Sequence, residues 1–175
     1  MDSVDVVLVD ARLNGQLAYG TEQAAGIDLR ACSVSFKGRE FAPIEEGKPF
    51  VLFPGEQCRV GSGVKLHIGS MFGDQVYEML KDGVTAAGML LPRSGIGTKH
   101  RVRLSNTVGL IDADYQGEII MVLENGGTEA WTIPALERVA QLVIIPVFRV
   151  GFNVVPAFDT ATLRGDGGFG STGCK

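Results

Sequence analysis

A series of short, apolar and β-branched runs is the feature that most constrains the fold of this 175-residue chain. Glycine, proline, asparagine and aspartate separate the runs, as at Pro54-Gly55 and Asn125-Gly126, and such residues favour turns. Several short strands at regular spacing are typical of a β-sandwich or barrel. No amphipathic helical pattern persists between the runs, which argues against βαβ units. The expected strands are Val4–Val9, Phe50–Phe53, Arg59–His67, Ala86–Leu91, Arg101–Leu104, Ile119–Leu123, Trp131–Ile133, Val139–Val147 and Phe152–Val155.

Composition narrows the class of protein further. At this length one domain is the default, and the net charge of −4 is spread along the chain without a basic tract. The longest apolar run, residues 142–147, is too short to span a bilayer, and the chain starts without the basic region of a secretory signal. Its three cysteines and two histidines lack the spacing of a zinc site. We expect a cytoplasmic protein that binds neither a membrane nor nucleic acid directly.

Residues 69–88 break the β-like rhythm and are predicted to be an insertion. Val76, Met79 and Leu80 fall at helical spacing within it. A short helix and a surface loop bracketed by glycines are both compatible with this pattern. The sequence leaves that choice open.

The C-terminal stretch RGDGGFGSTG matches the glycine pattern of dinucleotide-binding loops, but the context excludes that interpretation. Gly170 is five residues from the last residue given, so no helix follows it. Glycines let backbone N–H groups approach an anion, Arg164 offers a fork for phosphate oxygens, and Phe169 offers a face for stacking. From composition alone a disordered tail is favoured.

Four upstream segments carry groups that suit phosphate and a base. PRSG, residues 92–95, places a guanidinium, a hydroxyl and a bare backbone together, and NTVGLIDADYQG, residues 106–117, adds an amide, two carboxylates and a phenol. AGIDL, residues 25–29, contains one carboxylate, and RVAQ, residues 138–141, contains a cation and an amide. Each has an ordinary structural explanation, such as a capped turn or an ion pair. Together they indicate a β domain with a site for phosphate and a base.

The five segments, in this order, closely resemble the five motifs of the trimeric dUTP diphosphatases (dUTPases), in particular their bacterial and phage branch. The resemblance runs from about Ala24 to Gly173. It implies an all-β, jelly-roll-like barrel or sandwich with at most one or two short helices, and a homotrimer with sites shared between subunits. It also implies a β-rich hydrolase domain over residues 1–163. A mobile, glycine-rich arm, residues 164–175, would then close over the nucleotide of a neighbouring subunit.

The reaction implied by the resemblance is Mg²⁺-dependent hydrolysis of dUTP to dUMP and pyrophosphate, by attack of water on the α-phosphorus. This reaction limits uracil incorporation into DNA and supplies dUMP for thymidylate synthesis. Asp112 matches the family's water-binding aspartate and is the expected general base. Asp28 is expected near the metal, through water, and Arg138 matches a more structural arginine.

The resemblance also assigns the residues that bind dUTP. Those expected on the phosphates are Arg93, Ser94, Gly95, Gln141, Arg164, Gly170, Ser171 and Thr172. Tyr115 is expected on the deoxyribose and Phe169 on the uracil ring. The groups expected to recognise the edge of uracil are Asn106 and the backbone around Leu110, Ile111 and Ile120.

Two other functions compete with this interpretation. The dCTP deaminases share the fold and the trimer, but need a glutamate base near the pyrimidine and usually lack the glycine-rich arm. A non-catalytic nucleotide sensor that binds a partner through residues 69–88 is disfavoured, because the apparent catalytic groups are all present.

Overall fold

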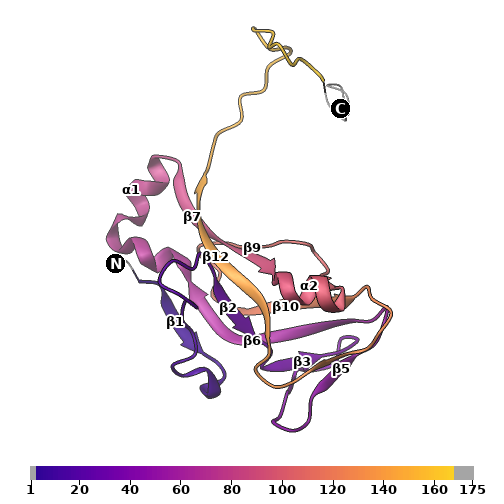
Figure 1. Ribbon diagram of the computed structural model, residues 1–175. Helices are drawn as coiled ribbons and strands as arrows, with labels where there is room; N and C mark the ends of the chain where they lie inside the picture. The colour runs from indigo at the N-terminus through magenta and orange to yellow at the C-terminus, as the bar shows by residue number, and fades with distance from the viewer. Residues whose placement is uncertain (1–2, 168–175) are drawn as a thin grey trace.

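The structure is a computed structural model that describes residues 3–167, without the side chains of Asp74, Val76, Tyr77 and Met79. Its strands form a six-stranded sheet, a four-stranded sheet and a two-stranded sheet (Figure 1). The six-stranded sheet has the order β4-β3-β6-β10-β8, and β1 pairs with β6. Its strands are β1 Asp5–Leu8, β3 Ser33–Ser35, β4 Ala42–Pro43, β6 Gln57–His67, β8 Val102–Leu104 and β10 Glu118–Asn125.

The four-stranded sheet has the order β2-β12-β7-β9 and is antiparallel throughout. Its strands are β2 Ile27–Arg30, β7 Val84–Pro92, β9 Gly109–Ile111 and β12 Arg138–Phe148. The two-stranded sheet pairs β5 Phe50–Leu52 with β11 Trp131–Ile133. The helical elements are the 3₁₀ helices η1 Ala11–Leu13 and η2 Ile68–Gln75 and the α-helices α1 Val76–Lys81 and α2 Ser94–His100.

One hydrophobic core lies between the two larger sheets. Strand β10 alternates buried and half-buried residues along its length, as expected when one face of a strand is buried. Its buried side chains Ile119, Met121 and Leu123 belong to the same cluster as Leu90 of β7 and Leu142 of β12. Burial of each such side chain contributes roughly 1.5–3 kcal/mol. The predicted all-β, jelly-roll-like sandwich with two short α-helices is confirmed.

The structure differs from the strands expected from sequence in three ways: it adds the short strands β2, β3, β4 and β9, it adds a helix, and it lacks one expected strand. Val76–Lys81 forms a helix, which settles the open choice for the insertion, and SGIGTKH forms the unexpected helix α2. The predicted strand Phe152–Val155 is wrong, because these residues pair with no strand among residues 3–167 and Phe152 is 92% exposed. An apolar, β-branched run forms a strand only where another strand supplies hydrogen bonds.

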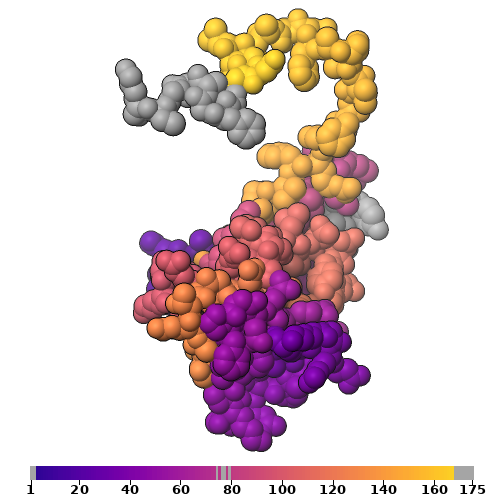
Figure 2. All heavy atoms as spheres, turned by 90° about the vertical axis from the view of Figure 1, so that its right-hand side faces the viewer, coloured from indigo at the N-terminus to yellow at the C-terminus, as the bar shows by residue number. Residues whose placement is uncertain are grey.

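Residues 149–167 leave the sheets and extend away from the body (Figures 1 and 2). Residues 149–167 contain no helix or strand. The apolar side chains of Phe152, Val154, Phe158 and Leu163 are almost fully exposed. This segment therefore adds nothing to the core of its own chain.

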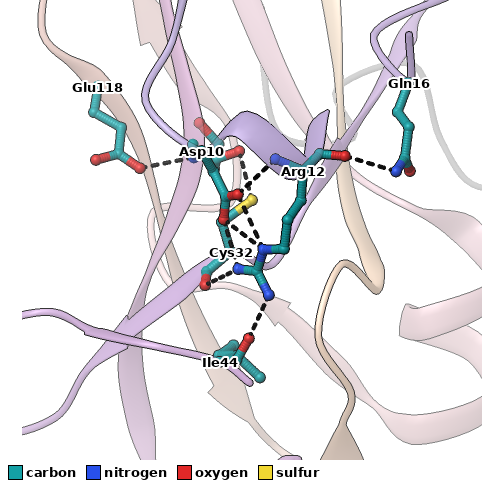
Figure 3. A network of polar contacts seen from close by, with 8 residues as sticks. Asp10, Arg12, Gln16, Cys32, Ile44 and Glu118 are labelled. Carbon is teal, nitrogen blue, oxygen red and sulfur yellow. Dashed lines mark hydrogen bonds and ion pairs between the residues drawn. The ribbon is translucent and has the colours of Figure 1, made fainter. Parts of the chain in front are cut away.

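A polar network fastens the segment after β1 to the larger sheet (Figure 3). The Arg12 guanidinium binds the Asp10 carboxylate and donates to the Ile44 and Cys32 carbonyls at 2.8 and 3.2 Å. The hydrogen bond from Arg12 lowers the pKa of Asp10. Glu118, at the start of β10, accepts a hydrogen bond of 2.7 Å from the backbone N–H of Gly63.

Cys32 and Cys58 are free thiols inside the core, as expected for cysteines without metal-like spacing. Burial raises the pKa of both thiols to about 12. Neither thiol therefore forms a reactive thiolate near neutral pH. Within residues 3–167, no helix combines the length and apolar character that crossing a membrane requires.

Candidate functional site

Three of the predicted motifs meet on neighbouring strands of the four-stranded sheet. Asp28 of β2 pairs with Gln141 of β12, and Gln141 pairs with Leu91 of β7, just before Arg93. The Asp28 carboxylate forms an ion pair with Arg93, with 2.8 Å between Oδ1 and Nε, and accepts a hydrogen bond of 3.1 Å from Arg138 Nη1. The side chains of Asp28 and Arg93 are each 27% exposed, so this cluster remains open to a ligand.

Arg138 contacts this cluster although the sequence placed it outside the site. In a regular strand, residues 138 and 141 would face opposite sides. The register between β12 and β2 shifts between Arg138 and Ala140, as a β-bulge does, so both side chains reach the Asp28 side. Arg138 also accepts a hydrogen bond from Arg93 through its carbonyl, at 3.3 Å. The three-residue spacing between Arg138 and Gln141 in RVAQ predicts opposite faces, so the sequence does not indicate this contact.

Helix α2 begins directly after Arg93. Ser94 and Gly95 are its first residues, and a helix leaves its first N–H groups without an intrahelical partner. No atom lies within 4 Å of the position that a Cβ on Gly95 would take. Gln141 Nε2 donates to the Pro92 carbonyl at 3.3 Å and so lies beside the same turn. Cationic and N–H donors gathered in this way suit phosphate oxygens.

The second group of predicted residues lies at the other end of the sheet, beside β9. Asp112 follows β9 directly, and the N–H of Tyr115 donates to the Asp112 carbonyl at 3.1 Å, which closes a turn. Asp112 is exposed and lines a cavity of about 630 Å³, a size that suits a small-molecule ligand. Other residues around this cavity include His67, Gly69, Thr85, Leu110, Asp114 and Arg149.

Tyr115 folds back over the backbone of Gly117. The phenol hydroxyl donates to the Glu118 carbonyl at 2.9 Å, and a Cβ on Gly117 would overlap the Tyr115 hydroxyl. Gly117 is therefore the residue that lets the ring take this position, and the ring remains 42% exposed.

The rest of the segment 106–120 divides between solvent and core; it is not a hairpin, because β9 pairs with β7 and β10 pairs with β6 and β8. Leu110 is 65% exposed, whereas Ile111 packs on the core. Ile120 is half-buried on β10, and the Asn106 carbonyl accepts a hydrogen bond of 2.7 Å from the N–H of Val108. A ligand bound against β9 would therefore contact the side chain of Leu110 but mainly the backbone of Ile111.

The two groups do not meet within one chain. Gln141 lies opposite Leu91 of β7, whereas Ile111 lies opposite Gly88. With about 3.3 Å per residue along a strand and about 4.8 Å between strands, Asp28 and Asp112 are roughly 20 Å apart. The cavity beside Asp112 is lined by none of Arg93, Ser94, Gly95 or Gln141. An α-phosphate held by Arg93 would lie far beyond the reach of Asp112 in the same chain.

The remaining predicted residues belong to the C-terminal segment. Arg164 is exposed, and its Nε donates to the Gly167 carbonyl at 2.9 Å, so it contacts neither group. Phe169, Gly170, Ser171 and Thr172 lie outside the described residues.

Comparisons with known proteins agree on one family. A sequence profile described as dUTPase matches residues 75–173. The deoxyuridine 5′-triphosphate nucleotidohydrolase of Bordetella pertussis is 45% identical over 174 residues, which cover 99% of each chain. The protein of the same name from Azoarcus sp. is 44% identical over 174 residues, again with 99% of each chain covered.

Solved structures agree at the level of the fold. The dUTPase of Staphylococcus bacteriophage 80alpha, solved with dUPNHPP, superposes with a TM-score of 0.74 at 21% identity, over 99% of this chain and all of that one. A mutant dUTPase from phage phi11 of S. aureus, described with a structural Mg(II) ion, gives a TM-score of 0.66 at 18% identity, over 90% of this chain and 99% of that one. The chain belongs to the dUTPase family.

Proposed function

We infer that this chain hydrolyses dUTP to dUMP and pyrophosphate, which keeps uracil out of DNA and supplies dUMP for thymidylate synthesis. The observation that carries this inference is the 45% identity, along nearly the whole chain, to a deoxyuridine 5′-triphosphate nucleotidohydrolase. The geometry supports it, because arginine and N–H donors gather at one end of the sheet and an exposed carboxylate lies at the other.

The proposed general base is Asp112. Its carboxylate orients a water molecule for in-line attack on the α-phosphorus and accepts the proton that the water loses, while pyrophosphate leaves on the opposite side. In phosphoryl transfer, positioning and charge neutralisation supply most of the rate acceleration. The groups that do this here are the proposed phosphate ligands Arg93, Ser94, Gly95 and Gln141, together with Arg164, Gly170, Ser171 and Thr172 of the arm.

Selectivity for deoxyuridine is assigned to the segment 106–120. The Asn106 side chain and the backbone around Leu110, Ile111 and Ile120 recognise the edge of uracil, because a mismatched edge would bury unpaired polar groups at about 1–3 kcal/mol each. Tyr115 covers the deoxyribose and leaves no space for a 2′-hydroxyl. Phe169 stacks on the base.

The residues fit a Mg²⁺ ion held mainly by the triphosphate. Within residues 3–167, no group of three or more His, Cys, Asp or Glu side chains forms a protein cage for a metal. Both oxygens of Asp28 are already engaged by arginines, one in an ion pair with Arg93 and one by a hydrogen bond from Arg138, which suits a contact to the ion through water. When bound, the ion would neutralise part of the triphosphate charge.

We propose that the chain forms a homotrimer. Each site then combines the Asp28–Arg93 group of one subunit with the segment 106–120, which carries Asp112, of another. The estimated separation of roughly 20 Å between the two groups supports this arrangement, because the reacting atoms must come within about 3.5 Å. The arm, residues 164–175, would complete the site. The division between domain and arm and the cytoplasmic location stay predictions.

Mixed trimers of two inactive variants test the shared site. Asp112→Asn and Arg93→Ala chains are each expected to be nearly inactive alone. After random mixing through unfolding and refolding, roughly a quarter of the sites would combine two wild-type halves. We therefore expect about a quarter of the wild-type turnover, measured on trimers verified by native mass spectrometry. Verified mixed trimers without recovered activity would mean that one chain supplies both halves.

Substrate choice distinguishes this function from cytosine deamination. The wild-type protein with Mg²⁺ is expected to release pyrophosphate from dUTP and to leave dCTP, dTTP and UTP essentially unchanged. Pyrophosphate and ammonia are measured in parallel in each reaction. Ammonia released from dCTP, without pyrophosphate from dUTP, would overturn the proposed activity.

A further inference from the structure

We propose that Gly69, in the segment between β6 and β7, is a positioning residue for the turn that carries Asp112. This inference rests on the proposed function, because it assigns Gly69 a role in dUTP hydrolysis. The backbone N–H of Gly69 donates a hydrogen bond of 2.8 Å to the carbonyl of Ala113, the residue directly after Asp112. Nothing in the five motifs includes Gly69.

This hydrogen bond holds the turn at residues 112–115 from outside the segment 106–120. The backbone pairing of β9 with β7 ends at Ile111, and the hydrogen bond from Tyr115 to Asp112 lies within the turn. Among the described residues, Gly69 makes the one hydrogen bond that reaches residues 112–116 from outside the segment 106–120. The orientation of Asp112 therefore depends on where Gly69 lies.

The packing around Gly69 is tight enough to transmit its position. A Cβ on Gly69 would lie 3.2 Å from the Ala113 carbonyl oxygen, closer than ordinary van der Waals contact. The fully buried Ile68 lies beside Gly88, the residue of β7 that pairs with Ile111 at the end of β9. A Cβ on Gly88 would lie 3.0 Å from Ile68 Cδ1 and 3.1 Å from Ile111 Cβ. Gly69 thus holds the Ala113 end of the Ile111–Ala113 stretch, while Ile68 and Ile111 approach the same side of Gly88 at its other end.

The segment that begins at Gly69 is itself fixed to the body. Ser70 Oγ accepts a hydrogen bond of 2.7 Å from the N–H of Asp5 in β1 and donates one of 2.6 Å to the His67 carbonyl. At the other end, the carbonyl of Gly83 accepts a hydrogen bond of 2.7 Å from the N–H of Arg149. Gly73 and Leu80 of this segment line the cavity beside Asp112. The insertion therefore forms part of the wall of the cavity beside Asp112 and is not a peripheral surface loop.

Gly69→Ala tests the proposal because it keeps the N–H donor and pushes on the Ala113 carbonyl. A misplacement of about 1 Å can reduce turnover by about 100-fold, and a shift of a few tenths of an ångström is smaller, so we expect a loss of about 10-fold in kcat. The KM for dUTP should stay within about twofold, because the proposed substrate contacts come from other residues. Steady-state kinetics with dUTP measure both values.

Gly127→Ala is the matched control. It also presses a new methyl group on a backbone carbonyl, 2.9 Å from that of His100, but beyond the opposite end of β10. We expect Gly127→Ala to lower the Tm while kcat stays within about twofold of wild type. Wild-type kcat in Gly69→Ala, or an equal loss in Gly127→Ala, would overturn the positioning role.

A milder variant decides the question if Gly69→Ala does not fold. Ile68→Val removes one buried methyl group, a change that typically costs about 0.5–1.5 kcal/mol of stability. We expect it to fold and to lower kcat by about threefold with unchanged KM, because Ile68 directly precedes Gly69 and its looser packing shifts the donor of the Gly69–Ala113 hydrogen bond. Wild-type kcat in Ile68→Val would then overturn the proposal. Wild-type turnover of dUTP, measured alongside, tests the proposed function separately, and its absence would remove both inferences.

Discussion

Replacement of Asp112 by asparagine is expected to reduce kcat for dUTP by at least about 100-fold, the low end for loss of a general base. Asparagine has nearly the same size and keeps one oxygen acceptor, but it does not take up the proton of the attacking water. Among residues 3–167, no ion pair or side-chain hydrogen bond engages the Asp112 carboxylate, so the substitution leaves no partner unsatisfied. Binding of a non-hydrolysable dUTP analogue, measured by calorimetry, should therefore change little.

Asp114→Asn provides the matched control for Asp112→Asn. Asp114 lies two residues further along the same turn, is exposed, and lines the same cavity. Its replacement removes the same charge from the cavity without removing the proposed base. We expect kcat to fall by less than about 10-fold. Equal losses in the two variants would attribute the effect of Asp112 to charge in the cavity rather than to proton transfer.

Truncation after Leu163 is expected to reduce kcat/KM for dUTP by on the order of 100-fold, because the proposed arm then no longer completes the site. The same change should leave the Tm almost unaltered. Among residues 3–167, the buried core residues all precede residue 143 and Arg164, Gly165 and Asp166 are exposed, so the described part of the deleted segment makes no core contact. Kinetics, thermal unfolding and native mass spectrometry of the truncated chain measure the three properties.

Arg164→Lys in the full-length chain separates the arginine from the rest of the arm. Lysine keeps the charge but lacks the planar fork that binds two phosphate oxygens. We expect an intermediate loss, about 10-fold in kcat/KM, since one of the charge-assisted hydrogen bonds is lost. Full activity of the truncated chain would contradict any role of residues 164–175 in closing the site.

Much of the fold and the motif residues could be predicted from sequence, because the signals are local. The alternation along Glu118–Asn125 follows directly from the pleat of a strand. The five motifs are contiguous segments, so their resemblance to a family does not depend on knowing which strands pair. The glycine-rich run SGIGTKH lacked a local helical signal, and helix α2 was missed for that reason.

The relations between distant segments were beyond the reach of any local pattern. Phe152–Val155 has the composition of a strand, yet no strand in the described part of the chain lies beside it. Arg138 and Asp28 are 110 positions apart in the chain, and they meet because the register between β12 and β2 shifts. The wide separation of Asp28 and Asp112 follows from the order β2-β12-β7-β9.

The residue chemistry of this protein was therefore readable along the chain, while the arrangement that makes the chemistry effective was not. Strand order and register are set by hydrogen bonds and core contacts between residues far apart in sequence. The same holds for the contact between Gly69 and Ala113, which joins two segments that no motif connects.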